Sequence, residues 1–540
     1  MMDRGHVNSG IHLWYRSYKA YLNHVYSYAF WQRMLSQTSP QRLYRARLKV
    51  LVAALVVCII YCFSGGLSGV TYSEPKGDMI VISATHYKNS TFYDPNTVAV
   101  LFTAEKSIPP TQRWHCVSKN ASGDLLVTET SPRNAYRPIK ECLWTTFIAT
   151  CNTVANPSTI RLTGAPTAEK SVVLPFQPAI DEHLPVVACF SPLFFNERWQ
   201  LVGLSIESYA AAGVSRQAYY VMSALKGVHD LLKIYETSRR RLVDVHYWTL
   251  PKHPEAKLQL DWRDQASAHA DCYLKYRDAA DFIIVSDIDD LLFPRYGPTL
   301  HSEFSQLTHN LPGVASFFYP RFDAEVLSET TFKKFHPATT LKHVRISNKA
   351  STGKSVHNTR EVEVVWIHWA DVKKGNATYY KLSPEDNMFV HVRNWTFGVD
   401  PNDFMQKSLS KPRNRIFPTI QSIIPPGLIR RMSEGFNETF EKWDNRKIMN
   451  RVKTTDYYYD AIDNCYNNML NAVDIHNKNP EAQGVICPTP ARCIIDRIPN
   501  VPCVVAHRTY KKVTLAPDWK FNNPVQDYSV RMERHGCILS

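Results

Sequence analysis

The sequence lacks several patterns by which whole classes of protein are recognised. Although it has 12 cysteines, none forms a Cys-x-x-Cys pair, which argues against a zinc ribbon and against a thioredoxin-like site. It has no internal repeat and no long low-complexity segment. Its composition, 44% hydrophobic with 21% charged residues, is that of a globular protein and excludes a disordered or fibrous chain. At 540 residues it has room for several domains.

A basic stripe is also missing from most of the chain, although the net charge is +14. Eight Lys or Arg and one acidic residue lie within residues 1–49, so this short segment carries half of the positive excess. After residue 49, Lys and Arg are not interleaved with aromatic residues in the manner of a nucleic-acid-binding face. We therefore expect no nucleic acid partner.

One segment is apolar enough to cross a membrane. Residues 50–63 (VLVAALVVCIIYCF) carry no charge, and the softer stretch up to Val70 extends the uncharged run to 21 residues. That length spans a bilayer at about 1.5 Å per residue. The core of the run also fits the hydrophobic region of a cleaved signal peptide, but the 49 residues before it far exceed a signal n-region. We therefore predict a retained transmembrane helix at 50–70.

The flanks of this run predict its orientation. Arg42, Arg45, Arg47 and Lys49 directly precede it, and positive charge stays on the cytosolic side. We therefore predict a single-pass type II protein whose residues from 71 onward face the lumen. Sequons for N-glycosylation all follow the predicted anchor, at Asn89, Asn120, Asn376, Asn394 and Asn437. Ten cysteines also follow it, and an oxidising lumen permits disulfides whose pairing one sequence does not reveal.

The chain after the predicted anchor divides into three stretches. Residues 71–182 hold short apolar or alternating stretches separated by Pro, Asn, Ser and Gly, which predicts a β-rich region. Residues 183–410 alternate strand and helix patterns, and residues 411–540 form a cysteine-containing extension that we expect to be folded. The basic cytosolic tail 1–49 and the anchor 50–70 complete the predicted organisation.

Alternating strand and helix patterns begin at Pro185. We expect strands at 185–190, 217–222, 241–248 and 281–286, with helices at 196–213, 228–237 and 264–278. Asn196 is the expected cap of the first helix and Gly213 its expected end. This order predicts an α/β fold with a mostly parallel sheet and flanking helices, in which ligands bind beyond the carboxyl ends of the strands.

Three carboxylates follow the last of these strands, at Asp287, Asp289 and Asp290. Carboxylates placed together repel one another, and a hard divalent cation with oxygen ligands offsets that repulsion. Asp287 and Asp289 are two positions apart, so on an extended segment they share a face. We interpret this pair as a metal site, where the cation neutralises a nucleotide-sugar diphosphate and stabilises the leaving group.

Two other interpretations of the motif are weaker. Asp-x-Asp tripeptides often lie in solvated turns, but this one follows a charge-free apolar strand in a parallel-sheet pattern. The haloacid-dehalogenase phosphatases also place Asp-x-Asp after a strand. Their domain begins with that motif, whereas three strand–helix units precede it here, and Leu291 stands where that class has Thr or Val.

Several blocks of the sequence together resemble glycosyltransferase family 92, over roughly residues 77–400. The clearest blocks are VVACFSPLFFNERW with Cys189 and Pro192, IESYAAAGVSRQAYYVMS, and HADCYLKYRDAADFIIVSDIDDLLFPR. VISATHYKN near residue 84 is similar to an upstream block of the family, and FVHVRNW, with His391 and Arg393, resembles a late one. The sequence departs from the family pattern at Asp290, where Glu is expected, so the carboxylate is kept but shortened.

The resemblance implies a GT-A-like fold, a UDP-sugar donor (UDP-galactose in the best-known members) and Mn²⁺ or another divalent cation. It further implies inversion at the anomeric carbon, with galactose added to a fucose or galactose of a glycan. It makes His391 a candidate metal ligand beside Asp287 and Asp289, and Arg393 a candidate contact of the phosphate oxygens. A structural histidine and a surface ion pair are the respective alternatives. We also count Asp290 among the candidate catalytic residues.

An inverting transfer needs one general base that deprotonates the acceptor hydroxyl. Glu363 and Asp371 flank the apolar stretch VVWIHWA, downstream of the Asp motif, and both are candidates for that base. Each also fits an ordinary surface carboxylate.

We therefore predict a metal-dependent inverting glycosyltransferase of the Golgi membrane, which transfers galactose from UDP-galactose to a glycan or glycoprotein. The alternative is a catalytically inactive, membrane-anchored carbohydrate-binding or scaffolding glycoprotein of the same fold. Asp287, Asp289 and Asp290 favour the enzyme, because a protein that only binds gains nothing from a repulsive carboxylate cluster.

Overall fold

The structure, a computed structural model, describes residues 77–167, 169–251, 253–370, 372–406, 419–478, 487–516, 519–525 and 528–539. The basic tail 1–49 and the predicted transmembrane helix 50–70 lie outside the described residues, so both stay predictions. Within the described part of the chain, no helix is both long enough and apolar enough to cross a bilayer.

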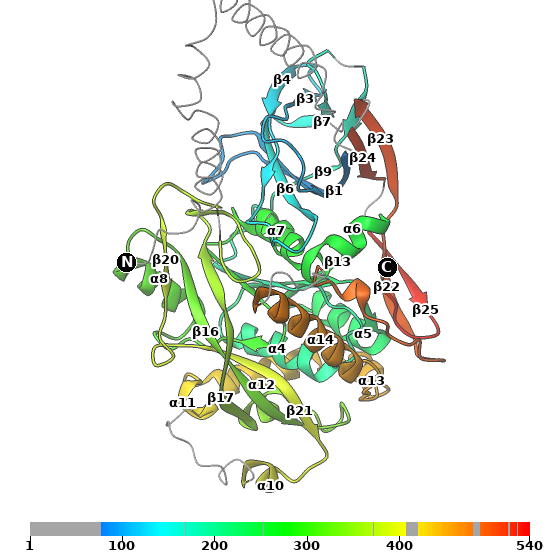
Figure 1. The fold of residues 1–540 in the computed structure, drawn as a ribbon. Helices are drawn as coiled ribbons and strands as arrows, with labels where there is room; N and C mark the ends of the chain where they lie inside the picture. Colours follow the sequence, from blue (N-terminus) through cyan, green and yellow to red (C-terminus); the bar gives the residue numbers. More distant parts are fainter. Residues whose placement is uncertain are drawn as a thin grey trace, which may run out of the picture. The chain divides into compact units, whose positions relative to one another are not determined.

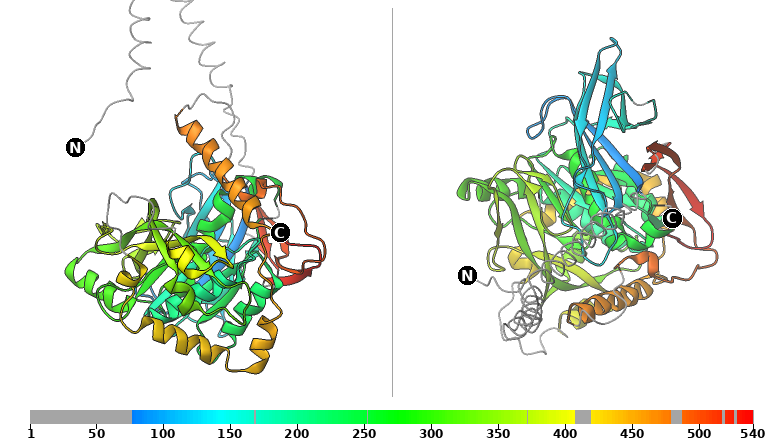
Figure 2. Two further views of the ribbon diagram at one scale, coloured as in Figure 1. Left: turned by 90° about the horizontal axis from the view of Figure 1, so that it is seen from below. Right: turned by 45° about the horizontal axis from the view of Figure 1, so that its top comes forward.

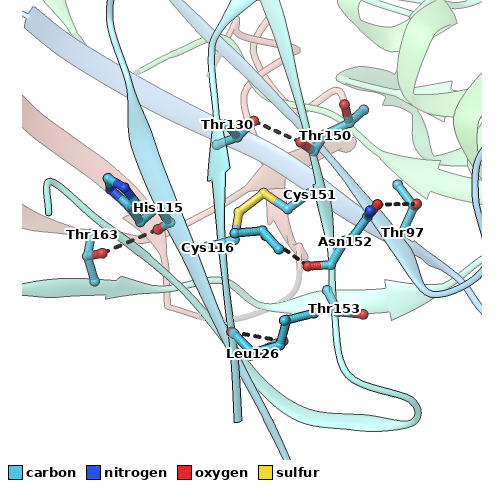
Figure 3. Close-up of a disulfide and its surroundings, with 12 residues drawn as sticks. Thr97, His115, Cys116, Leu126, Thr130, Thr150, Cys151, Asn152, Thr153 and Thr163 are labelled. Atoms are coloured by element: carbon cyan, nitrogen blue, oxygen red, sulfur yellow. Dashed lines mark hydrogen bonds between the residues drawn. A yellow bond between two sulfur atoms is a disulfide. The ribbon is translucent and has the colours of Figure 1, made fainter. Parts of the chain in front are cut away.

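The first part of the described chain is built of strands, as its apolar stretches predict. They are β1 (Gly77–Tyr87), β2 (Thr97–Glu105), β3 (Trp114–Asn120), β4 (Leu125–Thr130), β5 (Arg133–Asn134), β6 (Trp144–Asn152), β7 (Pro157–Thr163), β8 (Ser171–Val173) and β9 (Phe176–Pro178). One sheet contains β1, β2 and β6 as antiparallel neighbours, and another has the order β4-β3-β7-β8. The disulfide Cys116–Cys151 joins the two sheets, close to the hydrogen bond from the Thr130 hydroxyl to the Thr150 carbonyl (Figure 3).

Strands and helices then alternate through the centre of the chain. They are β10 (Val186–Phe190), α4 (Trp199–Ala211), β11 (Arg216–Val221), β12 (Ser223–Leu225), α5 (Lys226–Glu236), β13 (Val243–Tyr247), α6 (Pro254–Gln259), η1 (Asp261–Asp264), α7 (Gln265–Tyr276), β14 (Phe282–Ser286), β15 (Asp290–Leu291), α8 (Leu300–Asn310), β16 (Val314–Ser328), α9 (Pro337–Lys342), β17 (Val344–Asn358), β18 (Val362–Val364), β19 (Val372–Lys373), β20 (Thr378–Lys381), β21 (Phe389–Phe397) and α10 (Pro401–Gln406).

The expected strand and helix order is confirmed, with small shifts at the ends. The four predicted strands correspond to β10, β11, β13 and β14, and the three predicted helices to α4, α5 and α7. The expected Asn196 cap is wrong, because α4 begins at Trp199 and its N-cap Arg198 makes no side-chain capping bond. Gly213 follows the helix with a φ of 89°, a left-handed conformation that ends a helix as predicted.

The central sheet has the strand order β13-β11-β10-β14-β17-β16-β21-β15, with β20 beside β16. Its neighbours β13, β11, β10 and β14 are parallel, as are β16 and β21, whereas β17 runs antiparallel between β14 and β16. The prediction of a mostly parallel sheet is therefore confirmed. The mixed α/β architecture with flanking helices is consistent with a GT-A-like domain.

Both faces of this sheet are buried at its centre, which explains why β10 and β14 are almost wholly apolar rather than alternating. Along β10, the side chains of Val186, Ala188 and Phe190 join the core that contains α4 and α5. Val187 and Cys189 point to the opposite core, which contains α7 and residues of β1 and β2. The β-rich region thus covers one face of the central sheet.

The last part of the chain adds helices and then strands. They are α11 (Ile420–Ile423), α12 (Leu428–Thr439), α13 (Trp443–Met449), α14 (Tyr459–Lys478), η2 (Pro490–Arg492), β22 (Cys503–His507), β23 (Tyr510–Ala516), β24 (Trp519–Pro524) and β25 (Ser529–Glu533). β24 pairs in parallel with β1, so the two ends of the described chain share a sheet (Figure 1). Figure 2 shows α14 as the long orange helix.

The cysteines that follow the predicted anchor are paired. The disulfides are Cys116–Cys151, Cys142–Cys487, Cys189–Cys272, Cys465–Cys493 and Cys503–Cys537. Cys142–Cys487 spans 345 positions and ties the C-terminal part to the β-rich region, which no sequence spacing indicated. Cys189–Cys272 joins β10 to α7, so it fixes a helix against the strand that precedes the candidate site.

Candidate active site

A cavity of about 400 Å³ opens where β10 and β14 end. Ser191 follows β10 and the Asp motif follows β14, and the carboxyl ends of parallel neighbours lie at the same edge of a sheet. The remaining walls come from β21 and from α14 of the C-terminal part. The site therefore lies where the strand order predicts a ligand, with one wall that the sequence did not indicate.

The Asp motif forms a turn rather than an extended segment. The backbone N–H of Asp290 donates to the Asp287 carbonyl at 3.1 Å, and the Asp287 N–H donates to a carboxylate oxygen of Asp290 at 3.2 Å. The expectation that Asp287 and Asp289 share one face of an extended strand is therefore wrong. The turn separates them, and each carboxylate has its own partners.

The carboxylate of Asp287 is paired with cationic and hydrogen-bonding side chains of the protein. Lys354 Nζ on β17 lies 2.9 Å away, Gln265 Nε2 donates at 2.9 Å, and the Ser191 hydroxyl also donates to it. Burial raises the pKa of Asp287, but Lys354 and Arg321 hold it well below its usual range. Asp287 is not part of the group of possible metal ligands found among the described residues.

Asp289, Asp290 and His391 form a group that could hold a metal ion, with their ligand atoms all within 4.8 Å of one another. The strand register brings them together, because Asp290 on β15 is the direct partner of His391 on β21. His391 Nε2 lies 3.1 Å from an oxygen of Asp289. Oxygen and imidazole donors fit a hard or borderline divalent cation such as Mn²⁺. This group shares Asp289 and His391 with the predicted set of metal ligands, and it contains Asp290 instead of Asp287.

The other ring nitrogen of His391 is held by Asp323. Nδ1 lies 2.8 Å from an oxygen of Asp323, its direct neighbour on β16. Although burial lowers it, the carboxylates of Asp289 and Asp323 raise the pKa of His391 to about 10. The hydrogen bond from His391 outweighs burial and lowers the pKa of Asp323 to about 2. The Asp323 carboxylate accepts from Nδ1–H, so Nε2 faces the ligand group, where a bound cation would replace its proton, the arrangement of many metal-binding histidines.

Substituting Asp323 tests this arrangement. Asp323→Asn is expected to weaken Mn²⁺ binding by roughly 10- to 100-fold, because the imidazole loses the partner that fixes its orientation and raises its basicity. Titration of the purified full-length protein with Mn²⁺, followed by electron paramagnetic resonance, measures the change. An unchanged affinity would show that His391 binds no metal or needs no support from Asp323.

Arg321 on β16 pairs with carboxylates of the Asp motif. Its Nη1 lies 3.3 Å from both carboxylate oxygens of Asp290, whose side chain is 0% exposed. Burial raises the pKa of Asp290, and Arg321 opposes this shift. The guanidinium thus compensates the negative charge of a carboxylate that has no access to water.

The remaining predicted site residues lie in different places. Arg393 lines the cavity but is paired with Asp463 of α14. Glu363 on β18 is buried and paired with Arg133 of the β-rich region, away from the residues that line the cavity. Asp371 lies outside the described residues. Of the two predicted bases, Glu363 is therefore not brought to the Asp motif.

Sequence reasoning missed several polar residues of the cavity. Ser191 follows a predicted strand, so the rule that identified the Asp motif would also have found it. Lys354 and Arg321 lie on strands after that motif, and nothing in their local pattern distinguishes them from surface residues. His368 lines the cavity with its Nδ1 2.8 Å from the Gly353 carbonyl, and burial lowers its pKa to about 3, so it is neutral.

Several known proteins are similar to this chain in sequence. The model of glycosyltransferase family 92 matches residues 184–463, just over half of the chain, which include the whole Asp motif and His391. The glycosyltransferase family 92 protein F59C6.8 of Caenorhabditis elegans is 26% identical over 476 residues, covering 82% of this chain and 86% of the relative. Protein F13G3.3 of the same family and organism is 25% identical over 445 residues, covering 79% and 84%. The resemblance seen in the sequence blocks is confirmed.

Proposed function

The chain belongs to glycosyltransferase family 92, and we propose that it is a metal-dependent inverting enzyme that transfers galactose from UDP-galactose to a fucose or galactose hydroxyl of a glycan. Family membership supports glycosyltransferase activity. The donor, the acceptor, the stereochemistry and the metal are our proposals, which rest on the resemblance and on the site.

One observation carries the metal dependence: Asp289, Asp290 and His391 converge at the carboxyl end of a parallel strand, beside a cavity. A divalent cation bound there would neutralise the donor diphosphate and stabilise the leaving nucleotide. Asp290 is fixed by Arg321, and Asp323 orients His391, so these two ligands keep their positions before any donor binds. Asp289 is the ligand whose side chain has the larger exposure, 28%, toward the cavity.

The protein's own cations support an anionic donor. Lys354 is buried beside Asp287, and Arg321 lies between Asp287 and Asp290. They hold the pKa of Asp287 low, oppose the rise in the pKa of Asp290 that burial causes, and offset the repulsion within the Asp motif. The chain therefore keeps this cluster preorganised at the cost of buried charge, which favours catalysis over simple binding.

The general base is proposed to be Asp371. Ile367 and His368, a few positions before it, line the cavity. Asp371→Asn is expected to lower kcat by about 10²- to 10⁴-fold while Mn²⁺ binding persists, because the acceptor hydroxyl loses its proton acceptor. Glu363→Gln is the matched control, and its kcat should stay within about threefold since Glu363 is paired with Arg133. The opposite pattern would make Glu363 the base.

The protein is proposed to be a type II Golgi membrane protein whose residues from 71 onward face the lumen. The uncharged run 50–70 and the preceding basic residues support this orientation. The disulfides among the later cysteines fit an oxidising compartment. Glycosidase treatment of the protein from cells should remove N-glycans, and a protease added to intact microsomes should cleave residues 1–49 alone. Digestion of the main body under those conditions would contradict the topology.

Turnover of a panel of nucleotide sugars by the purified full-length protein tests the proposed activity. With Mn²⁺ and a mixture of glycan acceptors, we expect UDP-galactose to be consumed and chelator to stop the reaction. Turnover of a different donor would replace the galactosyl assignment and keep the enzyme class. No turnover of any donor by folded protein would favour the inactive carbohydrate-binding alternative.

A further inference from the structure

Strand β21 leads outward from the metal-ligand group along one wall of the cavity. His391, Arg393 and Trp395 all line the cavity, and the register of β21 with β16 shifts between Val392 and Asn394, at Arg393. At about 3.3 Å per residue, Arg393 is roughly 7 Å and Trp395 roughly 13 Å beyond the metal ligand. These two side chains are therefore too far from the metal ligands to contact the metal. They lie at a distance that suits contact with a sugar bound next to the donor.

Helix α14 forms the facing wall. Tyr459 and Asp463 are four positions apart and therefore lie on one face of the helix, and both line the cavity. The Tyr459 hydroxyl donates to the Arg393 carbonyl at 2.7 Å, and the Asp463 carboxylate pairs with the Arg393 guanidinium. The helix is thus bonded to β21 at the point where the cavity continues beyond the metal-ligand group.

The pair of Arg393 and Asp463 has little net charge. Its side chains are 36% and 35% exposed, so both keep hydrogen-bonding groups that a ligand can reach. Because Asp463 cancels the cation of Arg393 and would repel a diphosphate, this spot suits a neutral ligand with many hydroxyl groups. This proposal gives Arg393 a different role from the predicted contact with phosphate oxygens.

Trp395 adds an apolar surface next to this pair. Its ring is half-buried, lines the cavity and is held in place because Nε1 donates to the Val392 carbonyl at 2.8 Å. A pyranose ring presents one face of C–H groups and an equator of hydroxyls. An indole face beside a carboxylate–guanidinium pair complements both of these features.

We propose that Arg393, Asp463 and Trp395 form the subsite for the acceptor saccharide, between β21 and α14. This assignment rests on the proposed transferase function, because it places the acceptor beside the donor site. The second wall comes from the C-terminal part of the chain, so that part selects the acceptor while the Asp motif serves the donor.

Kinetics and direct binding with two simple probes, methyl α-L-fucopyranoside and methyl β-D-galactopyranoside, test the subsite on the full-length protein. Trp395→Ala and Asp463→Asn are expected to raise the acceptor KM by tenfold or more, with the donor KM changed by less than about threefold. Trp395→Phe, which keeps an aromatic face, should recover part of the loss. Trp443→Ala is the matched control, because that tryptophan is 72% exposed on α13, away from the cavity.

Saturation-transfer NMR separates this inference from the proposed function. Binding of either glycoside that is lost in Trp395→Ala supports the subsite even if no donor is turned over. Binding that survives both Trp395→Ala and Asp463→Asn, or no binding of either glycoside to wild-type protein, would overturn it. A fall in kcat with unchanged acceptor KM would also contradict a binding role. Thermal melting of each variant shows whether the fold is kept.

Discussion

Asp289→Ala is expected to reduce sugar transfer by about 10³-fold or more, since it removes the ligand of the metal group that is most open to the cavity. Its carboxylate lies 3.1 Å from His391 Nε2, so the substitution also leaves that imidazole without its partner on the cavity side. The backbone carbonyl of Asp289 accepts from the Val392 N–H at 2.8 Å, and this bond survives the change. The fold should therefore persist while activity is lost.

Initial rates of transfer at saturating Mn²⁺ measure this effect. Asp403→Ala is the control, because that carboxylate is exposed on α10 and does not line the cavity. Its rate should equal that of the wild-type protein. An Asp289→Ala variant that retains more than a tenth of the wild-type rate would show that Asp289 is not required for the reaction.

Glu197→Ala is expected to lower the free energy of unfolding by roughly 3–5 kcal/mol and to detach the start of α14. The Glu197 carboxylate is 4% exposed and accepts from the Thr455 hydroxyl at 2.8 Å. It also accepts from the backbone N–H groups of Tyr457, Tyr458 and Tyr459, at 2.7–2.9 Å. These N–H groups have no partner inside the helix, and a negative charge is favourable at a helix N-terminus.

Denaturant unfolding of the full-length protein measures the loss, and the acceptor KM reports the position of α14. Glu197→Gln keeps one carbonyl oxygen as acceptor and should fall between the wild-type protein and the alanine variant. Arg198, the next residue, pairs with Asp456 of the same segment, so the attachment is weakened rather than abolished. Equal stability of Glu197→Ala and wild type would contradict an anchoring role for this carboxylate.

The fold of the central region could be predicted because its signals are local. The central strands β10 and β14 are short, apolar and buried on both faces, and the helices have apolar residues at helical spacing. The position of the Asp motif after β14 follows from the same pattern. The sequence could not show that the motif forms a turn, since that depends on the hydrogen bond between Asp290 N–H and the Asp287 carbonyl.

The partners of the site could not be predicted because they come from distant segments. Asp290 and His391 are direct neighbours only through the pairing of β15 with β21, about a hundred positions apart. Lys354 pairs with Asp287, the carboxylate that was expected to bind metal. The sequence around Lys354 does not indicate that this lysine is buried. Glu197 was expected inside a helix, whereas it precedes α4 and faces α14.

The role of the C-terminal part could not be predicted from the sequence either. Its sequence predicted a folded extension without a function. In the structure α14 borders the cavity, held by Glu197 at its first turn and by the disulfide Cys465–Cys493. The family match ends at residue 463, within this helix, so the wall continues beyond the matched region. The part of this wall beyond residue 463, which includes Tyr466 and Leu470, is where we expect acceptor preferences to differ within the family.

Binding of Mn²⁺ to the purified full-length protein, with and without UDP, tests the proposed metal site. We expect electron paramagnetic resonance to show one bound Mn²⁺ per chain, held more tightly when UDP is present, and we expect His391→Ala and Asp289→Ala to abolish this binding. Absence of bound Mn²⁺ in the wild-type protein, or the same binding in both variants, would contradict a metal site at Asp289, Asp290 and His391.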